Sequence, residues 1–370
     1  MISRRILAGC AALLAATALT TTARAADTYL PSCFKPAAGD NKVTTATKPH
    51  AGPYRIALVN GFVANTWRQQ MIKTAQAFAA QPEIKKEIKE LKVVSVGEDL
   101  PAQLAAIDDF INQGYDAILI SPESGTGFDR VIRNAKKAGV VLIAFNGSIQ
   151  THDIVQITQN QVDFGRDWAK FVVAHMPAPK GTILEVAGIS GNPADVDRHA
   201  GQMEVLKQDP DIKVITVFGK WDDGTAQRVT ADALAANGHI DRMIVSGGST
   251  GAVRALMDAK HPFIPVAGEA ENGFRKLIAE HGKDGLAGIS IGNSPGQSAI
   301  SMLAAIALLQ GKTLPDTVEL PNPTATNDSL KAGEIYYPDL SDNFFTPNQF
   351  PPCGVNISGP EIMAQPDVKK

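Results

Sequence analysis

The chain has 370 residues, a formal net charge of −3 and a charged fraction of 20%. It carries no basic stripe and no basic tail, so we do not expect nucleic acid as a partner. The length suits two domains of ordinary size, each with a full hydrophobic core.

The N-terminus has the features of an export signal. A short basic region precedes an apolar run over residues 6–19, and a small-residue cleavage site that ends at Ala25 follows. This pattern predicts a secretory signal peptide over residues 1–25, cleaved after Ala25. No later run approaches the ~18 apolar residues of a membrane-spanning helix. We therefore expect a soluble mature protein in the periplasm.

Two cysteines remain after removal of the signal peptide, one near each end of the mature chain. Cys33 and Cys353 both stand in proline-rich contexts. An even cysteine count in an oxidising compartment predicts a disulfide between them. Two unpaired thiols are the alternative.

From residue 54 onward, short apolar runs alternate with amphipathic helical patterns. The predicted strands are residues 54–59, 92–96, 117–120, 140–145, 154–157, 182–187, 214–218, 243–246, 264–267 and 286–291. Regular alternation predicts parallel sheets with helices on both faces, and continuous apolar strands are typical of such sheets. Because ten strands are too many for one compact sheet, we expect an α/β protein with two similar doubly wound parallel-sheet domains.

The residues that follow each predicted strand are candidates for a ligand site, because ligands of open α/β sheets lie outside the carboxyl ends of the strands. The first of these loops carries Asn60, Phe62, Asn65 and Trp67. Amides that bond hydroxyl groups, next to flat apolar rings, suit a sugar or polyol. The alternative is that Asn65 or Thr66 caps the following helix and that the rings of Phe62 and Trp67 pack in the core.

Later strand ends add an arginine, carboxylates, amides and a second indole. These candidates are Asn146, Arg198, Trp221, Asp222, Glu269 and Asn293. Arginine offers a rigid fork of donors, a carboxylate accepts from neighbouring hydroxyls, and amides do both. Each residue alone is explained more simply by a cap or a turn. Together they predict a cleft for a neutral polyhydroxylated ligand, without a cofactor or a metal site.

One motif points to an enzyme instead. Residues 247–251 fit the G-x-S-x-G pattern of a nucleophile elbow between a strand and a helix, and Asp258 and His281 follow in the required order. However, Ser249 lies in the second half of a repeated array, and no His-Gly-Gly-type oxyanion loop precedes it. We therefore expect a binding protein and no enzyme, and keep a secreted serine hydrolase that uses Ser249 as an alternative.

Several stretches resemble one known family. They read ALVNGFVANTWRQQM, DAILISPESGTGFDRVIRNAKKAGVVLIAFN, ISGNPADVDRHAGQ, FGKWDDGTAQ, GAVRALMDA and GISIGNSPGQSA. In order and spacing, from about residue 54 to 314, they resemble the ribose-binding type of periplasmic sugar-binding protein of ABC importers, the type I fold shared with the LacI-type repressor core. The resemblance implies ligand contacts at Asn60, Phe62, Trp67, Asn146, Arg198, Trp221, Glu269 and Asn293. Ribose-type members have an Asp-Arg pair where this chain has Asn146-Gly147, so ribose itself is not implied.

The resemblance also implies a domain plan. Three crossings of the chain, near residues 158–160, 293–294 and 321–323, would form a three-strand hinge. The expected parts are an N-terminal surface segment (26–53), a first domain (54–158 with 294–322), and a second domain with the C-terminal tail (159–293 with 323–370). A monomer would capture a sugar or polyol between its domains and deliver it to the inner-membrane permease of an ABC importer. A ligand-sensing subunit for a receptor kinase is the remaining alternative.

Overall fold

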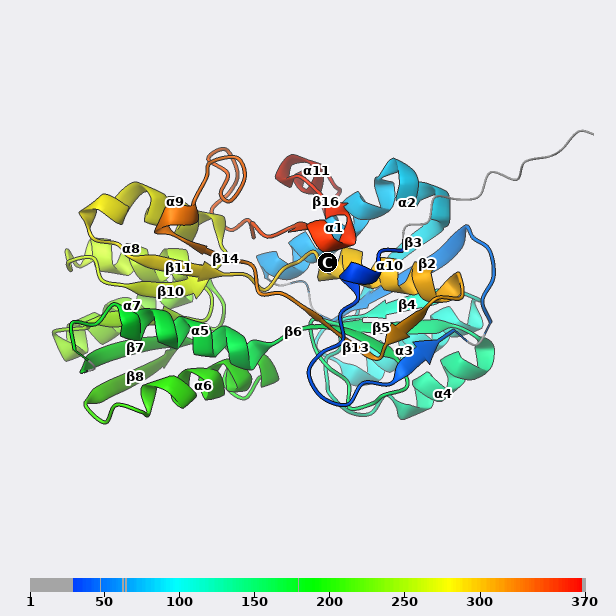
Figure 1. Ribbon diagram of the computed structural model, residues 1–370, viewed down its shortest axis with the longest axis horizontal. Coiled ribbons are helices and arrows are strands. Elements are labelled where there is room, and N and C mark those ends of the chain that lie inside the picture. Colours follow the sequence, from blue (N-terminus) through cyan, green and yellow to red (C-terminus); the bar gives the residue numbers. More distant parts are fainter. Residues whose placement is uncertain (1–28, 47, 62, 64, 179, 368–370) are drawn as a thin grey trace, which may run out of the picture.

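The computed structural model describes residues 29–46, 48–61, 63, 65–178 and 180–367. The predicted signal peptide and its cleavage site lie outside these residues. Two six-stranded sheets form the core of the molecule, side by side along its long axis (Figure 1). None of the helices in the described ranges is both long and apolar enough to span a bilayer.

The first sheet consists of six parallel strands. In spatial order they are β13 (Thr317–Leu320), β6 (Val155–Gln159), β5 (Val141–Phe145), β4 (Ala117–Ile120), β2 (Tyr54–Asn60) and β3 (Ile88–Ser95). Every residue of β4 and β5 is buried. These two strands are continuous apolar runs because helices cover both faces of the sheet.

The first sheet alternates its side chains between two helical layers. The helices are α1 (Thr66–Ala80), α2 (Pro82–Glu87), α3 (Leu100–Asn112), α4 (Asp129–Ala138) and α10 (Gln297–Leu309). Ile56 and Leu58 pack in one core with residues of α1 and α10. Ala57 and Val59 point to the opposite face and pack with α3 and α4. Since side chains of a strand alternate with period two, one strand serves both cores.

The second sheet repeats this strand order. It runs β14 (Thr324–Thr326), β11 (Gly288–Ile291), β10 (Val266–Glu269), β9 (Arg242–Val245), β7 (Gly181–Ala187) and β8 (Ile212–Phe218). Its helices are α5 (Gln161–Ala174), α6 (Pro193–Leu206), α7 (Asp223–Asn237), α8 (Ser249–Asp258) and α9 (Asn272–His281). The expected fold class, two similar doubly wound α/β domains, is confirmed.

Helices α5 and α6 touch backbone to backbone. A Cβ atom on Gly165 would lie 1.9 Å from the carbonyl oxygen of Arg198, and one on Gly201 would lie 1.9 Å from that of Val162. Neither position can accept a side chain without separating the helices. This close contact fixes Arg198, on α6, against the first turn of α5.

The chain passes between the sheets at three connections, β6 to α5, β11 to α10 and β13 to β14. Edge strand β14 is antiparallel to β11, whereas edge strand β13 is parallel to β6. Both pairings follow because the carboxyl edges of the two sheets face the connections. Strand β13 ends at the carboxyl edge of the first sheet, parallel to its neighbours. The chain then enters the second sheet at the carboxyl edge of that sheet, so β14 runs opposite to β11.

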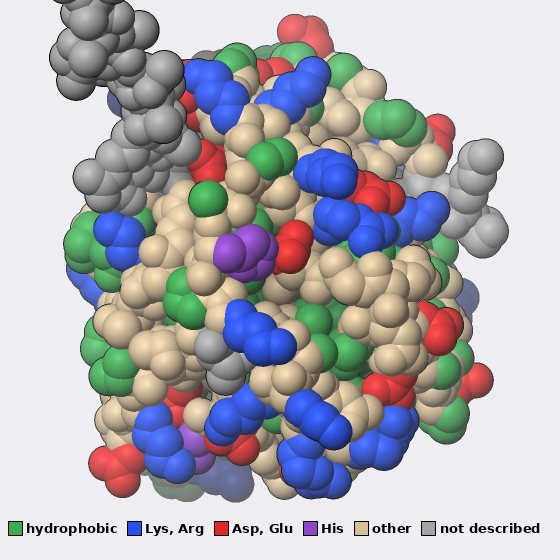
Figure 2. All heavy atoms as spheres, turned by 90° about the vertical axis from the view of Figure 1, so that its right-hand side faces the viewer, with side chains coloured by type: hydrophobic (Ala, Val, Ile, Leu, Met, Phe, Trp, Pro, Cys, Tyr) green, Lys and Arg blue, Asp and Glu red, His purple; other side chains and the backbone are tan. Residues whose placement is uncertain are grey.

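The N-terminal segment lies along the first domain. It contains the short helix η1 (Pro31–Cys33) and β1 (Val43–Thr45), which pairs antiparallel with β12 (Thr313–Pro315). Figure 2 shows the end face of this domain, where Lys and Arg side chains are interspersed with Asp and Glu and with scattered hydrophobic groups.

The C-terminal tail packs on both domains, whereas the expected boundaries placed all of it with the second. The Asn272 side chain of α9 donates to the carbonyl oxygen of Tyr337 at 2.8 Å, so the first part of the tail lies on the second domain. At Phe345 the tail bonds both ways with the side-chain amide of Gln70 on α1, each at 2.7 Å. Beyond it, hydrophobic residues that include Phe350 and Ile362 join the core of the first domain.

The last elements of the tail are β15 (Gln349–Phe350), the short helix η4 (Pro351–Cys353), β16 (Val355–Asn356) and α11 (Gly359–Met363). The remaining short helices are η2 (Gly282–Asp284) and η3 (Asn327–Ser329). Cys353 forms a disulfide with Cys33, with an S–S distance of 2.11 Å and a sequence separation of 320. The predicted pairing is confirmed, and it fastens the tail to the N-terminal segment on the first domain.

Replacing both cysteines (Cys33→Ser with Cys353→Ser) is expected to lower the free energy of unfolding by about 2–5 kcal/mol, because the crosslink restricts the unfolded chain over a long loop. Urea unfolding of the mature protein measures the difference. As a control, a thiol reductant must lower the stability of the wild type and leave the double variant unchanged. A double variant as stable as the wild type would contradict a stabilising role for the crosslink.

Candidate functional site

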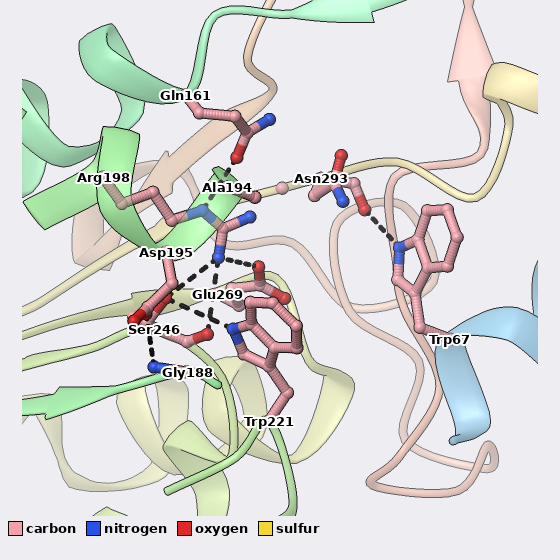
Figure 3. A network of polar contacts seen from close by, with 12 residues as sticks. Trp67, Gln161, Gly188, Ala194, Asp195, Arg198, Trp221, Ser246, Glu269 and Asn293 are labelled. Atoms are coloured by element: carbon pink, nitrogen blue, oxygen red, sulfur yellow. Dashed lines mark hydrogen bonds and ion pairs between the residues drawn. The ribbon is translucent and has the colours of Figure 1, made fainter. Parts of the chain in front are cut away.

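Most of the described site candidates fall into three hydrogen-bonded groups. One lies at the strand ends of the second sheet around Arg198, one at the second connection around Asn293, and one at the strand ends of the first sheet around Asn60. Figure 3 shows the first group together, with Trp67 and Asn293 bonded to each other beside it. Phe62 lies outside the described residues.

Arg198 is the centre of the second-domain group. Helix α6 begins after the N-cap Asn192, whose side chain accepts from the N–H of Ala194 at 2.9 Å. The guanidinium Nη1 of Arg198 donates to Glu269 Oε1 at 2.6 Å and to Ser246 Oγ at 3.2 Å. Its Nε donates to Gln161 Oε1 at 2.8 Å. Strands β9 and β10 and helix α5 therefore meet at one side chain.

The Arg198–Glu269 pair is almost fully removed from solvent, with side-chain exposures of 3% and 8%. Burial raises the pKa of Glu269, and the neighbouring Arg198 lowers it. The guanidinium also lies over the ring of Phe164, 4.4 Å from its centroid. Among the described residues, no hydrogen bond reaches Nη2 of Arg198 or Oε2 of Glu269. A donor group and an acceptor atom of the pair thus remain for a bound molecule.

Trp221 stands beside this pair in an uncommon backbone conformation (Figure 3). Lys220 and Trp221 both have φ of 57°, in the left-handed region that non-glycine residues rarely adopt. The indole packs on two glycines: a Cβ would lie 2.3 Å from it on Gly188 and 2.9 Å from it on Gly247. Its Nε1 donates to Ser246 Oγ at 3.4 Å. Backbone strain of this kind is typical of binding sites, where it aims a side chain.

The second group joins the predicted amides at the connection between β11 and α10. Asn293 Nδ2 donates to Asn146 Oδ1 at 3.1 Å. Trp67 Nε1 donates to the carbonyl oxygen of Asn293 at 2.7 Å. Trp67 is 7% exposed and belongs to the first-domain core, as the alternative for the rings stated. Asn146 also has a positive φ, 56°, at the end of β5.

The first-domain group contains charged residues that the sequence reasoning missed. Asn60 Oδ1 accepts from Arg68 Nη1 at 2.8 Å, and the same nitrogen donates to Ser121 Oγ at 2.7 Å. Glu123 lies 3.8 Å from Arg68 Nη2. Burial raises the pKa of Glu123 and lowers that of Arg68. Ser121 and Glu123 directly follow the predicted strand 117–120, so the rule applied to other strand ends could have found them.

Two predicted ligand residues act as helix caps. Asn65 Oδ1 accepts from the N–H of Arg68 at 2.8 Å and begins α1. Asp222 Oδ1 accepts from both the N–H and the hydroxyl of Thr225, each at 2.8 Å, and begins α7. Capping accounts for both side chains, so we leave them out of the site proposed below.

The residues of the hydrolase alternative do not form a triad. Ser249 is fully buried, and its Oγ accepts from the N–H of Glu269 at 3.0 Å. Asp258 bonds Gln227 at 2.8 Å, and His281 bonds Asp284 at 3.1 Å. Each member of the proposed triad has partners elsewhere in the second domain.

Glu271 stabilises the Gly-rich turn before α8 through hydrogen bonds. Its carboxylate accepts from the N–H groups of Gly248, Ser249 and Thr250 at 2.6, 2.7 and 3.2 Å. These are unpaired donors of the first helical turn, which need an acceptor. Burial, with the nearby carboxylate of Asp223, raises the pKa of Glu271 to about 8.

The geometry defines a class of protein. Two α/β domains with the same strand order carry polar and aromatic groups at their strand ends, on either side of three connections. This is the arrangement of a binding protein that encloses a small ligand between two domains. Residues 56–313 match the family model described as the periplasmic binding protein domain. The match covers well over half of the chain, and the chain belongs to this family.

Individual proteins in this family are moderately similar to the chain. The xylitol-binding protein of Mycolicibacterium smegmatis is 26% identical over 244 residues, which are 64% of this chain and 68% of that protein. The D-xylose-binding periplasmic protein of Escherichia coli is 29% identical over 258 residues, covering 65% and 72%.

Solved structures show the same fold. An ABC transporter solute binding protein from Thermobispora bispora has a TM-score of 0.65 at 29% identity, over 73% of this chain and 84% of that one. The periplasmic binding protein component of an arabinose ABC transporter from Shewanella has a TM-score of 0.64 at 21% identity, over 74% and 92%, and supports the fold alone.

Replacing Arg198 with Ala is expected to lower the free energy of unfolding by about 3–5 kcal/mol, because the buried carboxylate of Glu269 loses its partner. The matched control is Arg198→Met with Glu269→Leu, which removes both charges and is expected to recover much of the loss. Urea unfolding measures all three proteins, and an Arg198→Ala variant within about 1 kcal/mol of the wild type would refute the buried pair.

The stability of the protein is expected to fall as pH rises from about 4.5 to about 8. In this window the folded protein holds a proton on Glu271 that the unfolded chain, in which the pKa of a glutamate is about 4.5, has released. Unfolding free energies at several pH values, compared between the wild type and Glu271→Gln, isolate this contribution. The variant is expected to have the shallower pH dependence, and equal slopes would show that Glu271 does not titrate in this range.

Proposed function

We propose that this protein captures a sugar or polyol between its two domains in the periplasm and delivers it to the permease of an ABC importer. The observation that carries the proposal is the buried Arg198–Glu269 pair beside the indole of Trp221. The two charges compensate each other, so the site favours a neutral ligand. Nη2 of Arg198 and Oε2 of Glu269 suit neighbouring hydroxyl groups, and the indole suits the C–H face of a sugar.

The first domain and the connection supply the other contacts. Asn60, Asn146 and Asn293 are amides at the strand ends and the second connection. Trp67, at the start of α1, packs in the core and holds the carbonyl oxygen of Asn293, and Phe62 stays a prediction from the sequence. A ligand that bonds both domains stabilises the closed arrangement by its differential affinity for it. We infer that the mature protein begins after Ala25 and acts as a monomer. We also infer that the permease binds the closed form of the protein.

Related proteins narrow the choice of test ligands. Their names refer to xylitol, D-xylose, galactofuranose, D-allose and ribose. The ligand of this chain is expected among pentoses, hexoses and their polyols, of a size that the two domains can enclose.

A thermal-shift panel followed by calorimetry tests the proposal. D-xylose, xylitol, L-arabinose, D-ribose, D-allose, D-galactose and myo-inositol are compared with L-leucine as a non-sugar control. At ligand concentrations near 100 times Kd, binding adds about 2.7 kcal/mol. With an unfolding entropy of about 2.1 cal/mol/K per residue over the whole mature chain, this corresponds to a rise in Tm of about 4 °C. If no sugar or polyol raises Tm, or if L-leucine binds best, the proposal fails.

The variant Gly188→Ala assigns the binding to this site. Its methyl group would lie 2.3 Å from the Trp221 indole and displace it, so we expect affinity for the best panel ligand to fall about 10- to 100-fold, as for loss of an aromatic anchor. Gly224→Ala is the control, because its nearest atom would lie at an ordinary 3.6 Å. Unchanged affinity in Gly188→Ala would remove Trp221 from the site.

A further inference from the structure

Gln159 occupies the point where the chain first leaves the first domain. It is the last residue of β6, and α5 of the second domain begins two residues later. Gln159 is polar, yet it is only 5% exposed. A buried side-chain amide has two N–H groups and an acceptor oxygen to satisfy, so its partners show what the residue does.

Those partners lie on the other two connections between the domains. Gln159 Nε2 donates to the carbonyl oxygen of Gly292, at the second connection, at 2.9 Å. The same nitrogen bonds the third connection, at Pro321 O and Asn322 Oδ1, at 3.0 and 3.1 Å. Its Oε1 accepts from the N–H of Ser294, again at the second connection, at 2.8 Å. One side chain therefore holds all three connections together.

Three further hydrogen bonds to backbone carbonyl groups strengthen the same junction. Asn322 Nδ2 donates to the carbonyl oxygen of Asn160 at 3.1 Å, which joins the third connection to the first. The N–H of Gly292 donates to Pro323 O at 2.9 Å, which joins the second to the third. The hydroxyl of Ser294 bonds Pro347 of the C-terminal tail. A rotation of one connection must therefore move the others or break buried hydrogen bonds.

The junction is also linked to the candidate ligand residues. Gln297 Nε2 donates both to Gln159 Oε1, at 3.0 Å, and to Asn293 Oδ1, at 2.8 Å. Gln297 Oε1 accepts from the N–H of Asn146 at 3.2 Å. Gln159 is thus two hydrogen bonds away from Asn293 and Asn146 through a single intermediate side chain.

We propose that Gln159 is a positioning residue that makes the three connections bend as one unit and so sets the orientation of the two domains. The amide achieves this because it is donor and acceptor at once, and can bond carbonyl and N–H groups of different segments. Only the link through Gln297 to ligand contacts rests on the proposed function. The effect on domain orientation does not require a ligand.

A neighbouring residue provides a matched control. Gln156 lies on the same strand, is the same residue type and has the same 5% exposure. Its Oε1 accepts from the N–H of Ile149 at 2.7 Å, and its Nε2 donates to Thr151 O at 3.1 Å, both within the first domain. Replacing either glutamine with Leu removes buried hydrogen bonds from β6, but only Gln159→Leu releases the connections.

The experiment measures the distance between the domains in the ligand-free mature protein. Arg133 on α4 and Ala235 on α7 are exposed, and cysteines introduced there take spin labels while the native pair stays in its disulfide. Pulsed electron resonance then gives the distribution of label distances. We expect Gln159→Leu to broaden the distribution and shift its mean, and Gln156→Leu to reproduce the wild-type distribution.

Two outcomes would overturn the inference. One is a Gln159→Leu distribution that superimposes on that of the wild type, and the other is equal broadening in both variants. If Gln159→Leu does not fold, Asn322→Ala removes the two side-chain hydrogen bonds of the third connection, to Gln159 and to Asn160, and is expected to give a smaller broadening. An unchanged distribution would then count against the proposal. Because no sugar enters the measurement, its result is independent of the ligand panel.

Discussion

The buried pair between Arg198 and Glu269 is the interaction on which the site of the second domain depends. A guanidinium out of water needs partners for several donors, and here they come from α5, β9 and β10. Helix α6 can present Arg198 to all three only because Gly165 and Gly201 let it approach α5 closely. A residue that resembles a ligand contact therefore also holds four elements of the domain in register.

The two domains show how one strand order can serve different chemistry. In both, a residue at the end of the second strand from the far edge shapes the site: Asn60 is the last residue of β2, and Gly188 directly follows β7. Asn60 takes part through its side chain, whereas Gly188 contributes by having none. Trp221, whose backbone is left-handed, fills the space that the glycine leaves, and its indole nitrogen bonds Ser246.

Much of the fold and part of the site could be predicted from the sequence. The strands gave a strong signal because parallel strands covered on both faces are unbroken apolar runs. The sequence made Arg198, in the segment after β7, and Glu269, at the end of β10, candidates for one cleft, and the structure brings their side chains together. The sequence could not distinguish a ligand contact from a helix cap at Asn65 and Asp222, because the same short polar side chains serve both roles. The course of the tail depends on contacts such as Phe345 with Gln70, which join distant segments and leave no local pattern.

The disulfide between Cys33 and Cys353 gives the folded chain the connectivity of a ring. The bond joins residues 320 positions apart, so nearly every loop lies between its two ends. A single cut by a protease in any of these loops leaves one covalent molecule, whose halves remain attached through the sulfur atoms. Two cuts are needed to release a fragment. A chain cut once in this way keeps all of its residues in one molecule as long as the fold holds.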